Sequence, residues 1–197
     1  MATKQRGRPR SFDRDAALER ATMAFWEHGY ETTSITDLTD AMGIGAPSLY
    51  AAFGDKKTLF AEVVELYAVR YGSFGARALD EEPTARAGLA RLLTETATEF
   101  TDPSRPRGCL MICAAVNCVT PEVEKALRER REANIASFEH RLRAAIAAGE
   151  LPPDTDPSAL ARFVGAIIQG MSQQARDGAT REELQGVADA AMRAWPG

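Results

Sequence analysis

The sequence predicts an all-α protein of about nine helices, and three observations support this fold class. Apolar residues recur at helical spacing along almost the whole chain of 197 residues. Glycine and proline divide this pattern into segments of helix length. Alternating apolar and polar residues, the pattern typical of a strand, are nearly absent. With 45% apolar and 26% charged residues, the chain has a globular composition and can bury a core without disulfides.

The first two predicted helices have clear boundary signals. Helix formation begins near Asp13, an N-cap residue type, and stops at Gly29, because glycine readily adopts the left-handed conformation that ends helices. Ser34 and Asp37 then form a capping box that opens a second helix. Gly43 ends this helix after about two turns.

A third short helix follows almost at once. It opens with Pro47 in its first turn, where the missing N–H costs nothing, and its inner face carries Leu49 and Phe53. Gly54 and Asp55 end it and start a long fourth helix. The remaining predicted helices span about residues 84–101, 109–118, 121–148, 157–176 and 180–195.

Residues 34–53 predict a helix-turn-helix, in which the second helix lies in the DNA major groove. Small outward residues at the tip of this second helix let its backbone approach DNA closely. Ser48 can form a hydrogen bond with a base or a phosphate, and the hydroxyl groups of Tyr50 and Thr33 can donate hydrogen bonds to phosphate. Two short helices around a glycine also occur in many other folds. The candidate DNA contacts in this region are Thr33, Gly45, Ala46, Ser48, Tyr50 and Lys56.

Charge is distributed unevenly along the chain. Residues 1–10 carry a charge of +4, whereas residues 11–60 and 61–197 each carry −4. Only one end of the molecule is therefore suited to meet phosphate. We expect the basic arm, residues 1–12, to enter the minor groove, the alternative being a solvated tail. Its candidate DNA contacts are Arg6, Arg8 and Arg10.

The helix-turn-helix region resembles the TetR/AcrR family of transcriptional regulators. The matching positions are Ala17-Leu18, Phe25, Gly29-Tyr30, Thr33-Ser34-Ile35, Ala41-Met42-Gly43-Ile44, Ser48-Leu49-Tyr50, Phe53, Lys56 and Leu59. The resemblance implies a three-helix DNA-binding domain over residues 13–55 and a helical ligand-binding and dimerisation domain over residues 56–197. Residues 7–13 and 107–111 resemble a branch that includes ComR-like, copper-responsive repressors.

The cysteines allow two interpretations. Cys109 and Cys113 are four residues apart and would share a helix face, which suits a copper(I) thiolate pair or a redox switch. Alternatively they are small apolar residues of a buried helix. We expect no metal site and no cofactor, because resemblance to a copper-responsive branch does not show that this chain has the metal ligands of that branch. An odd count of three cysteines also argues against a disulfide framework.

The C-terminal region offers a cavity and a dimer seam. Apolar residues at helical spacing, together with one polar residue, are candidates for lining a ligand cavity, although such residues also form ordinary core: Phe100, Met111, Asn117, Phe138, Phe163 and Met171. The last two predicted helices carry more apolar surface than one protomer can bury, which favours a homodimer. The predicted seam comprises Leu160, Val164, Gly165, Ile168, Met171, Leu184, Val187, Ala191 and Trp195.

These features predict a homodimeric transcriptional repressor that binds palindromic double-stranded DNA and is released by a small-molecule effector. An activator, a constitutive DNA-binding protein and a copper- or redox-responsive regulator using Cys109 and Cys113 remain alternatives, as does a protein-binding adaptor. The chain has no Ser/His/acid or Cys/His set and no phosphate-binding loop, so we expect no enzyme. Without a secretory signal or a membrane-spanning apolar run, we expect a cytoplasmic protein and no membrane partner.

Overall fold

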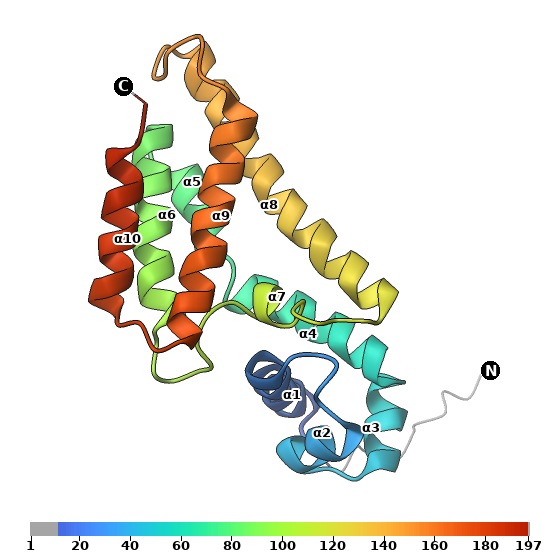
Figure 1. Cartoon of the computed structure of the whole chain (residues 1–197). Helices are drawn as coiled ribbons and strands as arrows, with labels where there is room; N and C mark the ends of the chain where they lie inside the picture. Colours follow the sequence, from blue (N-terminus) through green and yellow to red (C-terminus); the bar gives the residue numbers. More distant parts are fainter. Residues whose placement is uncertain (1–11, 197) are drawn as a thin grey trace, which may run out of the picture.

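The computed structural model describes residues 12–196, and in this range every regular element is a helix (Figure 1). The all-α fold class is therefore confirmed. Ten helices are present in the described part: α1 (Arg14–His28), α2 (Ile35–Met42), α3 (Ala46–Phe53), α4 (Lys56–Arg70), α5 (Phe74–Glu81), α6 (Ala85–Phe100), α7 (Leu110–Cys113), α8 (Pro121–Ala147), α9 (Pro157–Arg176) and α10 (Arg181–Arg193).

The N-terminal helix boundaries follow the predicted capping chemistry. The Asp13 carboxylate accepts two backbone N–H bonds at the start of α1, and Ser34 and Asp37 form a complete capping box at the start of α2. Gly43 ends α2 with φ +67° and ψ +34°, a left-handed conformation that costs glycine little. The tight turn between α2 and α3 therefore depends on this glycine.

Two segments differ from the sequence prediction. Helix α5 is not predicted, because its eight residues follow a turn and contain a glycine, Gly75. The helix predicted over residues 109–118 is wrong beyond its first turn. Only α7 forms there, because the chain turns after Cys113 and Asn117 adopts a left-handed φ of +57°.

Three apolar clusters form the core. The first joins α1–α4 to α7 and to Val123 and Leu127 at the start of α8. The second lies between α5, α6, α9 and the later part of α8, and the third lies between α6, α9 and α10. The apolar packing thus crosses the predicted domain boundary at residues 55/56, because α4, α7 and the start of α8 pack against the helix-turn-helix.

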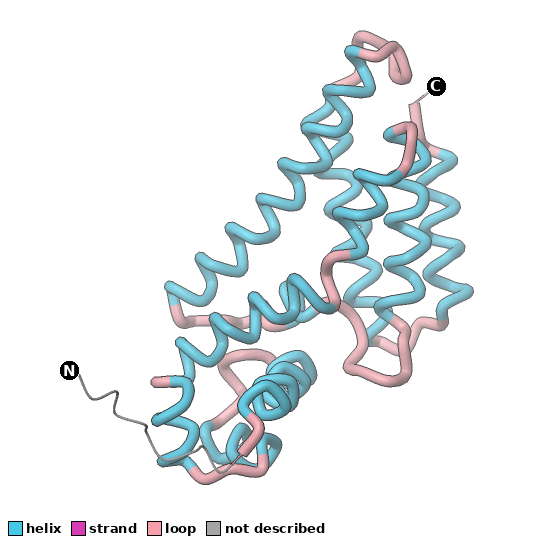
Figure 2. Tube along the Cα trace, turned by 180° about the vertical axis from the view of Figure 1, so that it is seen from behind, coloured by secondary structure: helices cyan, strands magenta, loops and turns pink. Residues whose placement is uncertain are grey.

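The helices have a simple arrangement in space. Helices α6, α9 and α10 run side by side, and α1–α3 lie at the opposite end of the molecule (Figures 1 and 2). The long helix α8 starts beside α4 and returns to the chain's last two helices through a turn at residues 148–156. No helix within residues 12–196 is long and apolar enough to cross a membrane.

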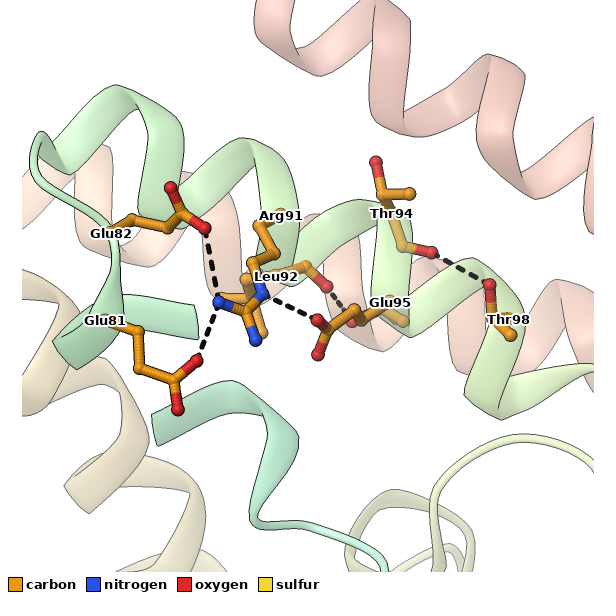
Figure 3. Close-up of polar contacts among 8 residues, drawn as sticks. Glu81, Glu82, Arg91, Leu92, Thr94, Glu95 and Thr98 are labelled. Atoms are coloured by element: carbon orange, nitrogen blue, oxygen red, sulfur yellow. Dashed lines mark hydrogen bonds and ion pairs between the residues drawn. The ribbon is translucent and has the colours of Figure 1, made fainter. Parts of the chain in front are cut away.

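Helix α5 packs closely against α6. A Cβ at Gly88 would lie 3.0 Å from a backbone oxygen of α5, a tight contact, so this crossing favours glycine. Arg91 of α6 donates to Glu81 at 2.9 Å, to Glu82 at 3.2 Å and, within its own helix, to Glu95 at 2.7 Å (Figure 3). These carboxylates raise the pKa of the Arg91 guanidinium, which stays charged and holds α5 in place.

Candidate nucleic-acid interface and internal cavity

Helix α3 presents small and polar residues at one end of the molecule. Leu49 and Phe53 anchor its inner side in the first cluster. On the outer side the Tyr50 side chain is 50% exposed, while Ser48 is half-buried. Gly45 is the N-cap of α3 and supplies no side-chain hydrogen bond, so its first turn is not closed by a side-chain cap. Such a helix start attracts negatively charged groups.

Two arginines of α1 hold α2 and α3 in position, and sequence reasoning missed both. The Arg20 guanidinium donates to the carbonyl oxygen of Met42 at 2.9 Å, at the C-terminal end of α2. Arg14 lies with its guanidinium carbon 4.4 Å from the ring centroid of Phe53 in α3. The same group donates to Glu62 of α4 at 2.6 Å. Each contact joins elements that are distant in sequence, so neither had a local signal.

Two predicted DNA contacts have other roles in the structure. Thr33 is only 1% exposed, and its hydroxyl donates to the carbonyl oxygen of Gly29 at 2.6 Å. Within the chain the hydroxyl hydrogen of Thr33 is thus already used, and its contact with phosphate stays a prediction. Lys56 lies over the ring of Tyr30, with 4.3 Å between Nζ and the ring centroid, and burial lowers its pKa. The arm residues Arg6, Arg8 and Arg10 lie outside the described residues.

A cavity of about 510 Å³ lies where the three clusters meet. Its apolar walls include Tyr67 of α4, Leu79 of α5 and Leu92 of α6. Three of the predicted lining residues also reach it: Phe100, Met111 and Phe138. A volume of this size suits a small organic molecule.

The other three predicted lining residues lie elsewhere. Asn117 is exposed and outside the cavity, because the helix expected to present it does not form. Phe163 is 43% exposed on the outer side of α9, and Met171 is fully buried in the third cluster. By contrast, Ile168, which was predicted for the dimer seam, lines the cavity.

Cys109 and Cys113 lie at the two ends of the single turn α7, Cys109 as its N-cap and Cys113 as its last residue. Cys109 precedes α7 in an extended conformation and lines the cavity, where burial raises the pKa of its thiol. Its backbone N–H donates to Oγ of Ser172 at 2.9 Å. The Cys113 sulfur lies 3.7 Å from the same hydroxyl. In the described part of the chain, no three His, Cys, Asp or Glu residues gather as a potential metal site.

Two polar contacts connect the helix-turn-helix region to the rest of the protein. The carboxylate of Glu31 accepts the backbone N–H groups of Val119 at 2.9 Å and Thr120 at 2.7 Å, directly before α8. The Thr120 side chain and, after it, these backbone bonds lower the pKa of Glu31. At the end of α9, Arg176 donates to the carbonyl oxygen of Glu27 at 3.0 Å, near the end of α1. Sequence reasoning gave no sign of either contact.

Comparison with known protein families decides the identity. Residues 17–63 match the family described as "Bacterial regulatory proteins, tetR family", and residues 85–192 match "Tetracyclin repressor-like, C-terminal domain". The chain belongs to the TetR family. The predicted family resemblance is therefore confirmed.

Individual TetR-family relatives extend over nearly the whole chain. The transcriptional repressor ComR of Escherichia coli K12 is 40% identical over 196 residues, covering 98% of this chain and 93% of ComR. A cysteine variant of CifR, solved with 26-bp operator DNA, is 46% identical with a TM-score of 0.93 and covers 96% of this chain and 100% of that one. A regulator from Rhodococcus sp. RHA1 is 40% identical with a TM-score of 0.64, covering 93% and 99%.

The outer face of α9 and α10 in this TetR-family chain differs in detail from the predicted seam. An apolar groove is lined by Leu160, Phe163, Ile167, Ala191 and Trp195, with further residues of α6, α9 and α10. Four predicted seam residues are instead buried inside the protomer: Val164, Gly165, Met171 and Leu184. Gly165 contacts the side chain of Ile135 on α8, so its small size serves packing within the chain. Val187 is half-buried beside the third cluster.

Proposed function

We propose that this TetR-family regulator is a homodimeric repressor that binds a palindromic operator through α3 and releases it when a small molecule occupies the cavity. The observation that carries this proposal is the exposed face of α3, with an open N-terminal turn, in a chain 46% identical to operator-bound CifR. Binding to the chromosome would place the protein in the cytoplasm.

The side chains of α3 support different roles at the DNA. Tyr50 extends from the outer face and supplies a hydroxyl for a phosphate oxygen. Ser48 is close enough to the helix start to reach a base edge. Gly45 and Ala46 have little or no side chain, which permits close backbone approach. Lys56, held against Tyr30, adds a positive charge beside this surface.

Dimerisation through α9 and α10 would place two α3 helices for successive major grooves. The groove around Phe163 supplies exposed apolar area, and no atom lies within 4 Å of a Cβ built at Gly170 or Gly186. Small residues on these helices therefore leave room for a second copy. A two-fold interface of this kind matches the symmetry of a palindromic operator.

Release would follow from the position of the cavity. A ligand in the cavity would contact all three apolar clusters, including Tyr67 of α4. Helix α4 is the next helix after α3 in the sequence. Through the contacts of Glu31 and Arg176, movements of α8 and α9 would be passed to the C-terminal end of α1 and the residues that follow it. Small shifts would change the separation of the two α3 helices from the approximately 34–36 Å that successive major grooves require.

The proposal is tested with full-length protein and duplexes from the DNA flanking its own gene, using fluorescence anisotropy. We expect tight binding to one palindromic segment and weak binding to a shuffled duplex of the same composition. Deletion of residues 1–10 removes four cations and should flatten the salt dependence of binding. Equal affinity for both duplexes would contradict the proposal. Transcription from a reporter should rise when the regulator is absent; a fall would indicate an activator.

A further inference from the structure

The charged groups around the cavity are all cationic. A second lobe of about 70 Å³ adjoins the main cavity and shares Cys109, Met111, Asn134, Phe138 and Ile168 with it. Arg130 lines the main cavity, Arg131 lines the second lobe, and no carboxylate lines either one among the described residues. An anionic ligand would therefore meet no like charge among the lining residues themselves; the Glu65 carboxylate lies behind Arg130, as its ion-pair partner.

The charged and amide side chains of the lining come from one helix, while Tyr67, Ser73 and Thr96 supply hydroxyl groups from other elements. Helix α8 contributes Arg130, Asn134 and Ser137, which follow one another at helical spacing on one side. The apolar wall comes largely from other helices and includes Phe74, Leu92 and Phe100. A ligand that fills this space would have an apolar, preferably aromatic, body and one polar end directed at α8.

Arg130 and Arg131 have N–H donors available for the polar end of such a ligand. Arg130 forms an ion pair with Glu65 of α4, and the side chains of this pair are 41% and 66% exposed. A pair this exposed contributes little free energy, so a second anion can displace Glu65 at small cost. Arg131 donates one N–H to the carbonyl oxygen of Met111 at 3.0 Å. A guanidinium has five N–H donors, so this bond occupies only part of its capacity.

We propose that the effector is an organic anion with an apolar body. Its carboxylate or equivalent group would replace Glu65 as the ion-pair partner of Arg130. This inference rests on the proposed effector-controlled function. Binding would exchange a link between α8 and α4 for a link between α8 and the ligand. Because α4 follows α3 directly, the loss of that link gives the effector a route to the DNA-binding surface.

The test uses three probes that share one apolar body: phenylbutyrate, phenylbutanol and phenylbutylamine. Isothermal titration with the full-length protein should give tightest binding for phenylbutyrate and weakest for phenylbutylamine. Arg130→Gln should weaken phenylbutyrate binding by about tenfold or more, since charge-assisted bonds are the strong ones. Glu65→Gln removes the competing carboxylate and should tighten phenylbutyrate binding severalfold.

Arg128→Gln is the matched control, because Arg128 lies on α8 but pairs with Glu124 and does not line the cavity. It should leave phenylbutyrate affinity unchanged. The inference is overturned if phenylbutyrate fails to bind at millimolar concentration, if phenylbutylamine binds equally well, or if both Arg130→Gln and Glu65→Gln leave the affinity unchanged. Operator binding without probe is measured on the same preparation. Its persistence would show that only the effector class is wrong, whereas its absence would contradict the proposed function itself.

Discussion

Aromatic rings fill most of the interior of the reading half, α1–α4, whereas a cavity of about 510 Å³ lies mainly among residues of the sensing half, α5–α10, and reaches only the end of α4. Six side chains of the reading half form two groups of three rings, with centroids 4.9–6.0 Å apart within each group: Phe25, Tyr30 and Phe60, and Trp26, Tyr67 and Tyr71. Both halves are built from helices. They differ in how completely the space between helices is filled.

This difference matches two tasks. A densely packed interior resists deformation and keeps α3 in a fixed position relative to α1 and α2. A cavity wall lacks partners on one side and can rearrange when a ligand supplies them. The same helical architecture thus supports a rigid reading surface and an adaptable sensing region.

The largest expected effect compares Phe25→Ala with Phe138→Ala. Phe25 is fully buried among rings, so its loss should lower the free energy of unfolding by about 3–5 kcal/mol. Phe138 lines the cavity and should lose clearly less, because part of its surface already lacks contacts. Denaturant unfolding of the two variants measures both values. Equal losses of unfolding free energy in the two variants would contradict the proposed difference in packing between the halves.

The outer face of the sensing half provides the next test. Phe163→Asp places a charge in the apolar groove of α9 and α10 and should weaken self-association by about 2 kcal/mol or more. Sedimentation should then show monomers, and operator binding should fall. Ala136→Asp, at an exposed position of α8 outside the groove, is the control and should remain dimeric. A dimeric Phe163→Asp protein would place the seam elsewhere.

Two substitutions in the reading half separate base contacts from phosphate contacts. Ser48→Ala should cost about 1–3 kcal/mol of operator binding and relax the preference at particular base pairs. Tyr50→Phe should weaken binding to operator and shuffled DNA to a similar extent, because phosphate carries no sequence information. Binding to a panel of single-base operator variants measures both. An unchanged sequence preference in Ser48→Ala would remove Ser48 from the base contacts.

The smallest expected effect concerns the link between the halves. Glu31→Gln should lower the free energy of unfolding by about 1 kcal/mol at neutral pH, since the carboxylate is partly exposed. Folding lowers the pKa of Glu31, so its contribution is complete above the ordinary value of 4.5 and disappears as pH falls through the lower folded value. Unfolding measured against pH should show wild type and variant converging in acid. A difference independent of pH would indicate a role other than charge.

Local signals predicted the helices of the reading half well. The capping box of Ser34 and Asp37 and the left-handed Gly43 depend on residues adjacent in sequence, and the structure confirms them. The side-chain partners of Thr33 and Lys56 depend on packing across elements. Sequence therefore placed these residues in the correct region without showing that their polar groups are already engaged.

The sensing half shows why helical periodicity has limits. Phe163 and Ile168 lie on the same apolar helix, and the sequence assigned the first to the cavity and the second to the seam. In the structure Ile168 lines the cavity, whereas Phe163 lies in the outer groove of α9 and α10. Helix α9 contacts α6, α8 and α10, so it is apolar on several sides. Periodicity identifies such sides but does not show which faces a neighbouring helix, a ligand or a second protomer.

Glu31 accepts the backbone N–H groups of the two residues that precede α8, so the DNA-binding region helps to position a helix that belongs to the other half. The first apolar cluster likewise includes α7 and two residues of α8. A chimeric regulator joined after residue 55 would separate these partners and leave the N–H groups of Val119 and Thr120 without this acceptor. Recombination that creates new sensors in this scaffold should therefore preserve the pairing of residue 31 with the segment before α8.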